Sequence, residues 1–124
     1  MTRAMTTRTL FATPIYQASL AGEKGFETFI DDLHDACVAI AEEDEAGQAW
    51  AYNKGYLGYT SYASLNDLPL RDSLFAELKK KLDKHAAAFA KDLCFDLGAG
   101  KLVMDSFWIN ILAVSYTHLT LPTT

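Results

Sequence analysis

Histidines are the first residues in this chain that could bind a metal ion or move a proton, and there are three: His34, His85 and His118. None of them begins an HxH, HxxxH or HxD motif, the spacings that direct two ligands to one metal ion. Cys37 and Cys94 also lack ligand spacing, and both fall among apolar residues, which predicts two buried, reduced thiols. The pattern therefore predicts no metal site and no catalytic residue within the chain.

Polar and aromatic residues offer weaker candidates for a site. The loop 55–58 lacks the Lys-Ser/Thr of a phosphate-binding loop, and Ser61 and Ser64 lack the glycines of a nucleophile elbow. Four tyrosines predict either a half-buried surface or a pocket for a planar ligand: Tyr52, Tyr56, Tyr59 and Tyr62. Asn110 lies among apolar residues, so we expect it to be buried and to hydrogen-bond either neighbouring backbone or a ligand.

Two amphipathic helices are predicted to position these residues. Apolar residues recur at helical spacing over 26–43 and again over 75–93. Asp72 or Ser73 can cap the second helix, and Gly98 and Gly100 are predicted to stop it. The acidic run 42–45 stands where the helix dipole disfavours negative charge. We therefore expect the first helix to fray there, with the four carboxylates solvated.

Three segments predict extended structure. Residues 10–18 read as a short edge strand because Pro14 cannot donate to a ladder. Residues 50–65 combine glycines with aromatic residues, which favours extended backbone over helix. Residues 101–112 alternate with two largely apolar faces, which is typical of a central strand. Helices and strands in this order indicate an α+β fold.

Composition excludes several classes of partner. Half of the 124 residues are apolar, so a packed core is expected, and a net charge of −5 opposes binding to nucleic acid. No apolar run is long enough to span a membrane, and the start has no apolar segment typical of a secretory signal. We therefore expect a cytoplasmic protein with neither membrane nor nucleic acid as a partner.

Three blocks occur in a particular order: Leu10-Phe11-Ala12-Thr13-Pro14-Ile15-Tyr16, Gly58-Tyr59-Thr60-Ser61 and Trp108-Ile109-Asn110-Ile111. Together they resemble a largely bacterial family of 2-oxoglutarate- and Fe(II)-dependent oxygenases over about residues 10–112. The resemblance implies a helical N-terminal region followed by a double-stranded β-helix, or jelly roll. It also implies that the iron ligands come from a His-containing motif after the Trp-x-Asn strand and from a later His, with Fe(II) and 2-oxoglutarate as cofactors.

None of those ligands has a counterpart in this chain, so the resemblance carries over only Trp108 and Asn110, as residues near the cofactor site. Residues 114–124 instead resemble a translated sequencing adapter. We therefore expect a disordered N-terminus over 1–9, the N-terminal part of an oxygenase-like domain over 10–113, and a non-native tail over 114–124. Such a truncated chain would bind no cofactor and could self-associate through the exposed edge of its last strand.

Two hypotheses of function emerge. In the first, the chain is an inactive fragment of an oxygenase that hydroxylates an unknown small molecule or protein. In the second, it is a small non-catalytic α+β interaction module, because two helices and two or three strands can form a minimal core. A third possibility, that the tail is native and forms a strand beside residues 101–112, remains open.

Overall fold

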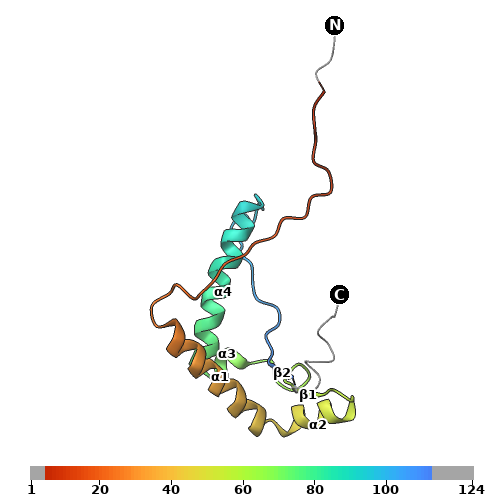
Figure 1. The fold of residues 1–124 in the computed structure, drawn as a ribbon, viewed down its shortest axis with the longest axis vertical. Coiled ribbons are helices and arrows are strands. Elements are labelled where there is room, and N and C mark those ends of the chain that lie inside the picture. Colours follow the sequence, from red (N-terminus) through yellow and green to blue (C-terminus); the bar gives the residue numbers. More distant parts are fainter. Residues whose placement is uncertain (1–4, 113–124) are drawn as a thin grey trace.

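The computed structural model describes residues 5–112, which form four helices and two short strands (Figure 1). In chain order these are α1 (Phe26–Glu43), α2 (Glu45–Asn53), β1 (Gly58–Thr60), α3 (Leu68–Arg71), α4 (Ser73–Asp92) and β2 (Asn110–Leu112). The predicted adapter-derived tail, the predicted tail strand and His118 lie outside the described residues. The fold is α+β, as the sequence predicts.

The two long helices confirm the amphipathic patterns. α1 occupies the predicted range and begins after Gly25, whose φ of 77° is a left-handed conformation that glycine adopts at little cost. α4 begins after Asp72, whose carboxylate Oδ1 accepts a hydrogen bond from the Leu74 amide at 2.8 Å. None of the helices within residues 5–112 is long and apolar enough to cross a membrane.

The end of α4 differs from the prediction. The helix stops at Asp92 rather than at Gly98, because Cys94 takes the left-handed conformation with φ 58°. The Phe95 amide then donates to the Ala90 carbonyl, and the Cys94 amide to Lys91, which is the hydrogen-bond pattern of a Schellman cap. Cys94 is exposed at this cap, so the prediction that it is a buried thiol was wrong.

Residues 44–54 correct a second prediction. Glu42, Glu43 and Glu45 are exposed, as predicted, but Asp44 is not, and the chain leads directly into α2 instead of fraying. That helix includes Trp50 to Asn53, which were predicted to be extended. Asp44 caps α2, since its Oδ1 accepts from the Gly47 amide at 3.0 Å. Only residues 58–60 of the predicted extended stretch form a strand.

The core lies where the two long helices meet the small sheet. Its most buried members come from five segments, and Leu68 and Phe75 are its largest fully buried apolar side chains. Phe107 packs edge-on against Phe75, with ring centroids 5.9 Å apart. The buried residues of this core are Ala36, Tyr59, Leu68, Phe75 and Ile109, with Leu33, Ile40, Phe107 and Ile111 packed against them.

The sheet consists of β1 and β2 in antiparallel register, with Gly58 opposite Leu112, Tyr59 opposite Ile111 and Thr60 opposite Asn110. The predicted strands were therefore too long. Residues 101–109 belong to no helix or strand, although Ile109 hydrogen-bonds Ser61, and residues 10–18 form no strand in the described structure. Ile109 is buried and Phe107 and Ile111 are half-buried, so the predicted alternation of faces is confirmed over the last residues only.

Gly58 allows the two strands to approach. Its φ is 153°, and a Cβ built at this position would overlap the carbonyl oxygen of Ile111 on the partner strand. Gly58→Ala should therefore lower the free energy of unfolding by more than about 1 kcal/mol, as measured by urea denaturation. Gly22→Ala is the matched control, because a Cβ there meets no atom within 4 Å, and it should leave stability unchanged. Equal effects of the two substitutions would contradict this account of the strand pair.

Candidate functional site

Asn110 and Trp108, the two residues that the resemblance points to, lie at the first residue of β2 and just before that strand. Asn110 is exposed on β2, so the prediction that it is buried was wrong. Its side chain belongs to the face of the sheet that does not carry Ile109 and Ile111, because successive residues of a strand alternate between faces. The Asn110 side chain is therefore not packed in the core and is accessible to a ligand.

Trp108 is held by aromatic neighbours rather than by the core. Its ring meets Tyr62 edge-on with centroids 5.1 Å apart, and Tyr62 meets Trp50 in the same way at 6.5 Å. Trp108 nevertheless remains 42% exposed. The predicted tyrosine cluster is thus divided: Tyr59 is buried in the core, Tyr52 and Tyr62 are exposed, and the four do not line one pocket.

A groove of about 480 Å³ separates β2 from α1. Its wall on the strand side consists of residues 109–111, and its wall on the helix side is largely apolar: Ile30, Leu33, His34, Cys37 and Val38. Burial raises the pKa of the Cys37 thiol, which keeps it protonated and weakly nucleophilic. His34 is exposed, and its nearest ionic contact is Asp35 at 3.7 Å. The groove therefore suits apolar contact better than acid–base chemistry.

Ser61 attaches β2 to the turn that follows β1. Its amide donates to the Ile109 carbonyl at 3.0 Å, and the Ile109 amide donates to the Ser61 hydroxyl at 2.9 Å. The Ser61 carbonyl is not free for a ladder bond because the Ser64 and Leu65 amides donate to it. The Ser61 hydroxyl therefore takes the place of the Ser61 carbonyl as the acceptor for the Ile109 amide. The local sequence did not predict this role.

Asp44 is the second residue whose role was not predicted. In addition to capping α2 through Oδ1, it accepts through Oδ2 from the Tyr59 hydroxyl at 2.7 Å and from the Ser64 hydroxyl at 2.5 Å. Gly47 stands so close that a Cβ would overlap this carboxylate. One side chain thus joins a helix N-terminus to a strand and to a turn, which corrects its interpretation as a solvated charge.

The hydrogen bonds of Asp44 alter two pKa values. Burial of the carboxyl acts to raise the pKa of Asp44, but hydrogen bonds from Ser64, Tyr59 and the Gly47 amide outweigh it, and the pKa falls below its ordinary value. Burial, together with the bond to Asp44, raises the pKa of Tyr59 far above its usual range. The pair is therefore ionised at Asp44 and neutral at Tyr59 at pH 7.

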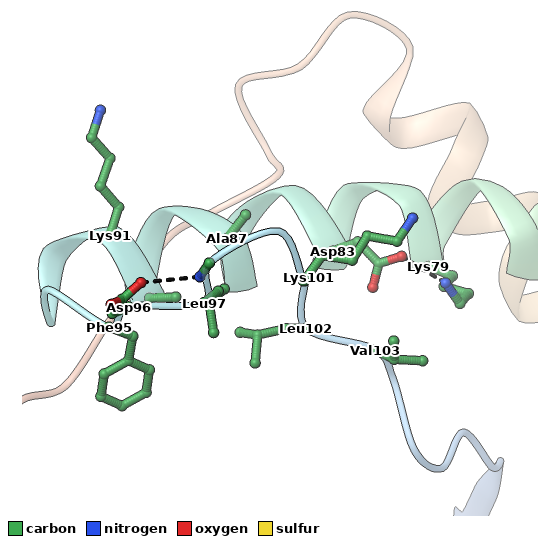
Figure 2. Close-up of a pocket in the computed structure, with 13 residues that line it drawn as sticks. Lys79, Asp83, Ala87, Lys91, Phe95, Asp96, Leu97, Lys101, Leu102 and Val103 are labelled. Atoms are coloured by element: carbon green, nitrogen blue, oxygen red, sulfur yellow. Dashed lines mark hydrogen bonds and ion pairs between the residues drawn. The ribbon is translucent and has the colours of Figure 1, made fainter.

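A cavity larger than the groove beside β2 lies elsewhere, between α4 and residues 95–103 (Figure 2). Its volume is about 730 Å³, and both apolar side chains and charged side chains of either sign line it. Its charged groups are already engaged in part: the Lys79 ammonium contacts Asp83 at 2.6 Å, and Asp96 accepts from the Gly98 amide at 3.0 Å. No residue of the predicted site lines this cavity.

His85 lies on α4, where its Nδ1 is 2.7 Å from the Tyr16 hydroxyl, while the Tyr16 ring packs on Phe89. This contact fastens the N-terminal segment to α4 and leaves His85 half-buried, with a structural partner. Within residues 5–112, no three His, Cys, Asp or Glu side chains lie close enough together to hold a metal ion. The described residues therefore do not fit an Fe(II) site.

Known proteins offer no independent guide to this site: no model of a protein family matches the chain, and a search of curated proteins finds no match either.

Removal of the Ser61 hydroxyl should leave the buried Ile109 amide without an acceptor. Ser61→Ala should therefore cost about 1–3 kcal/mol of unfolding free energy, measured by urea denaturation. Ser106→Ala is the control, because the Ser106 hydroxyl is exposed and donates only to its neighbour Asp105. A Ser61→Ala protein as stable as the control would show that the Ser61–Ile109 bond does not hold the strand.

The lowered pKa of Asp44 should make stability depend on pH. A carboxyl group whose pKa is lower in the folded state than in the unfolded state stabilises the fold when it is ionised. This stabilisation is at its full size above the unfolded-state pKa of about 3.9. It is lost as the pH falls through the folded-state pKa. The parent chain should therefore lose more stability below about pH 4 than Asp44→Asn does, in chemical denaturation at a series of pH values. Asp32→Asn, at an exposed position of α1, should keep the parent's pH dependence. If Asp44→Asn also keeps the parent's pH dependence, the ionised Asp44 carboxylate does not stabilise the fold.

Proposed function

We propose that residues 10–112 are the N-terminal portion of a 2-oxoglutarate- and Fe(II)-dependent oxygenase with a jelly-roll core, and that they support its active site without supplying the iron ligands. One observation carries the proposal: Trp108, just before β2, and Asn110, its first residue, are exposed, while Ile109 and Ile111 pack in the core. This is the arrangement expected of a strand that has a helical layer behind it and a site in front.

The support given to β2 is consistent with this role. Ser61 fixes Ile109 through two hydrogen bonds, and Tyr62 holds the Trp108 ring from the side. Asn110 directly follows these two anchored residues, so its position is fixed without a hydrogen bond from its side-chain amide. A preorganised amide of this kind could orient a polar co-substrate by hydrogen bonding.

Iron and 2-oxoglutarate would bring the oxidative chemistry of this family, but the described residues offer no ligand set for the metal. No reaction step is therefore assigned to them. We propose that the ligands belong to a segment beyond β2, that the substrate is a small molecule or a protein, and that the enzyme is cytoplasmic. The net charge of −5 argues against a nucleic acid substrate.

A second candidate function is that of a non-catalytic interaction module. The observation that favours it is the apolar groove between α1 and β2, which a partner segment could fill without any chemistry. The two candidates differ in how the gene continues after the codon for Leu112. An open frame that continues into a His-containing motif favours the oxygenase, whereas a stop codon close to Ala113 favours the module.

The test is to read the genomic frame past the codon for Leu112 and to assay its product with Fe(II) and 2-oxoglutarate. The product should release succinate, and the 124-residue chain should release none above a metal-free blank. Asn110→Ala in the active product should lower kcat/KM at least about fivefold, the equivalent of one hydrogen bond of ~1 kcal/mol. Asn66→Ala, at another exposed asparagine, is the control.

Three results would contradict the proposal: a frame that ends near Ala113, a longer product that does not couple 2-oxoglutarate turnover to Fe(II), and Fe(II)-dependent succinate from the 124-residue chain itself.

A further inference from the structure

The N-terminal segment is an apolar arm whose Phe11 and Ile15 side chains are largely uncovered by the rest of residues 5–112. Residues 8–15 have no regular structure, and no backbone hydrogen bond joins them to other described residues. Phe11 is 98% exposed and Ile15 is 77% exposed. Phe11 has a φ of 62° in the separate chain, so it must turn to extended backbone before the segment can form a strand. The segment is then a candidate for pairing with a strand edge, since its backbone groups and its apolar surface are both unsatisfied.

β2 has a free edge of the matching kind. It pairs with β1 alone among the described strands, and Ser61 and Ile109 are hydrogen-bonded partners across that pair. Because backbone groups alternate between the two edges of a strand, those of Asn110 point away from β1. The apolar groove against α1 adjoins this strand, so an added strand would bury apolar side chains as well as satisfy backbone groups.

The sequence of the arm fits this edge. If the odd-numbered residues 11, 13 and 15 turn their amides toward β2, Pro14 lies on the outer edge, where its missing N–H costs no ladder bond. Phe11 and Ile15 then project from the same face of the added strand, at the spacing of alternate pairs. Charge agrees as well: Arg8 is the one charged residue between 5 and 22, and α1 exposes Asp31 and Asp35 beside the residues that line the groove.

The arm of the same chain is not placed to reach this edge. Tyr16 fastens its root to α4 through His85 and Phe89, and from there the arm runs away from the sheet (Figure 1). A second copy has no such constraint. Each copy offers one arm and one edge, so two copies can exchange arms reciprocally about a two-fold axis and leave neither element uncovered.

We propose that residues 8–15 of one copy add as a strand to the free edge of β2 in a second copy, over the groove lined by α1, and that the exchange is reciprocal. The occupant of the groove is thus a defined segment of this same chain. The exchange covers Phe11 and Ile15 and gives β2 a second neighbour.

The first test compares two substitutions at apolar side chains that are almost fully exposed in the monomer. Phe11→Asp places a charge in the arm, and Leu70→Asp places one on α3 at a side chain that is 90% exposed, so neither should disturb the fold of the monomer. Light scattering after size exclusion, over a dilution series, should show a dimer for the parent and for Leu70→Asp. Phe11→Asp should be monomeric at the same concentrations with an unchanged circular dichroism spectrum.

The second test identifies which copy supplies the arm. In a Cys94→Ser background, Ile15→Cys should oxidise with Cys37 of another copy and run as a covalent dimer on a non-reducing gel, whereas Leu70→Cys should not. A monomeric parent, or a dimer that survives Phe11→Asp, would overturn the proposal. So would a disulfide within one chain, which would show that the arm docks on its own sheet.

Discussion

The carboxylate of Asp44 is the constraint on which the rest of the structure depends. It turns the chain from α1 into α2 by capping the second helix, and it also holds the Tyr59 hydroxyl of β1 and the Ser64 hydroxyl of the following turn. A charged acceptor forms stronger hydrogen bonds than a neutral one. The folded protein is therefore destabilised when any of the donors to this carboxylate is removed. Without the carboxylate, only the packing of Tyr59 in the core would fix the short strand β1 relative to α1.

The position of β1 in turn determines where the candidate site lies. A three-residue strand pair is marginal by itself, so β2 depends on the Ser61–Ile109 bonds and on the packing of Ile109 and Phe107 in the core. The exposed side of β2 is then free for Asn110 and Trp108. The strand is packed on one side and exposes polar groups on the other. This arrangement is compatible both with part of an active site and with a docking surface, so the structure supports either candidate function.

The sequence predicted the parts of the fold that local pattern determines. Both long helices follow from apolar spacing, and the Asp72 cap follows from residue type. Long-range effects account for the failures. The period-two pattern of 101–112 predicts a strand only if a partner is present, and β1 is three residues long. Asp44 was taken as a solvated charge because its three donors lie 3, 15 and 20 residues away, which no local rule reveals.

The most direct measurement of this account is a double-mutant cycle between Asp44 and Tyr59, with unfolding free energies for Asp44→Ala, Tyr59→Phe and the double variant. If the carboxylate organises β1 through this bond, the two effects should be non-additive, with a coupling energy of at least about 1 kcal/mol. Additive effects, with the strand pair intact in Asp44→Ala, would contradict the claim that this one side chain holds helix, strand and turn together.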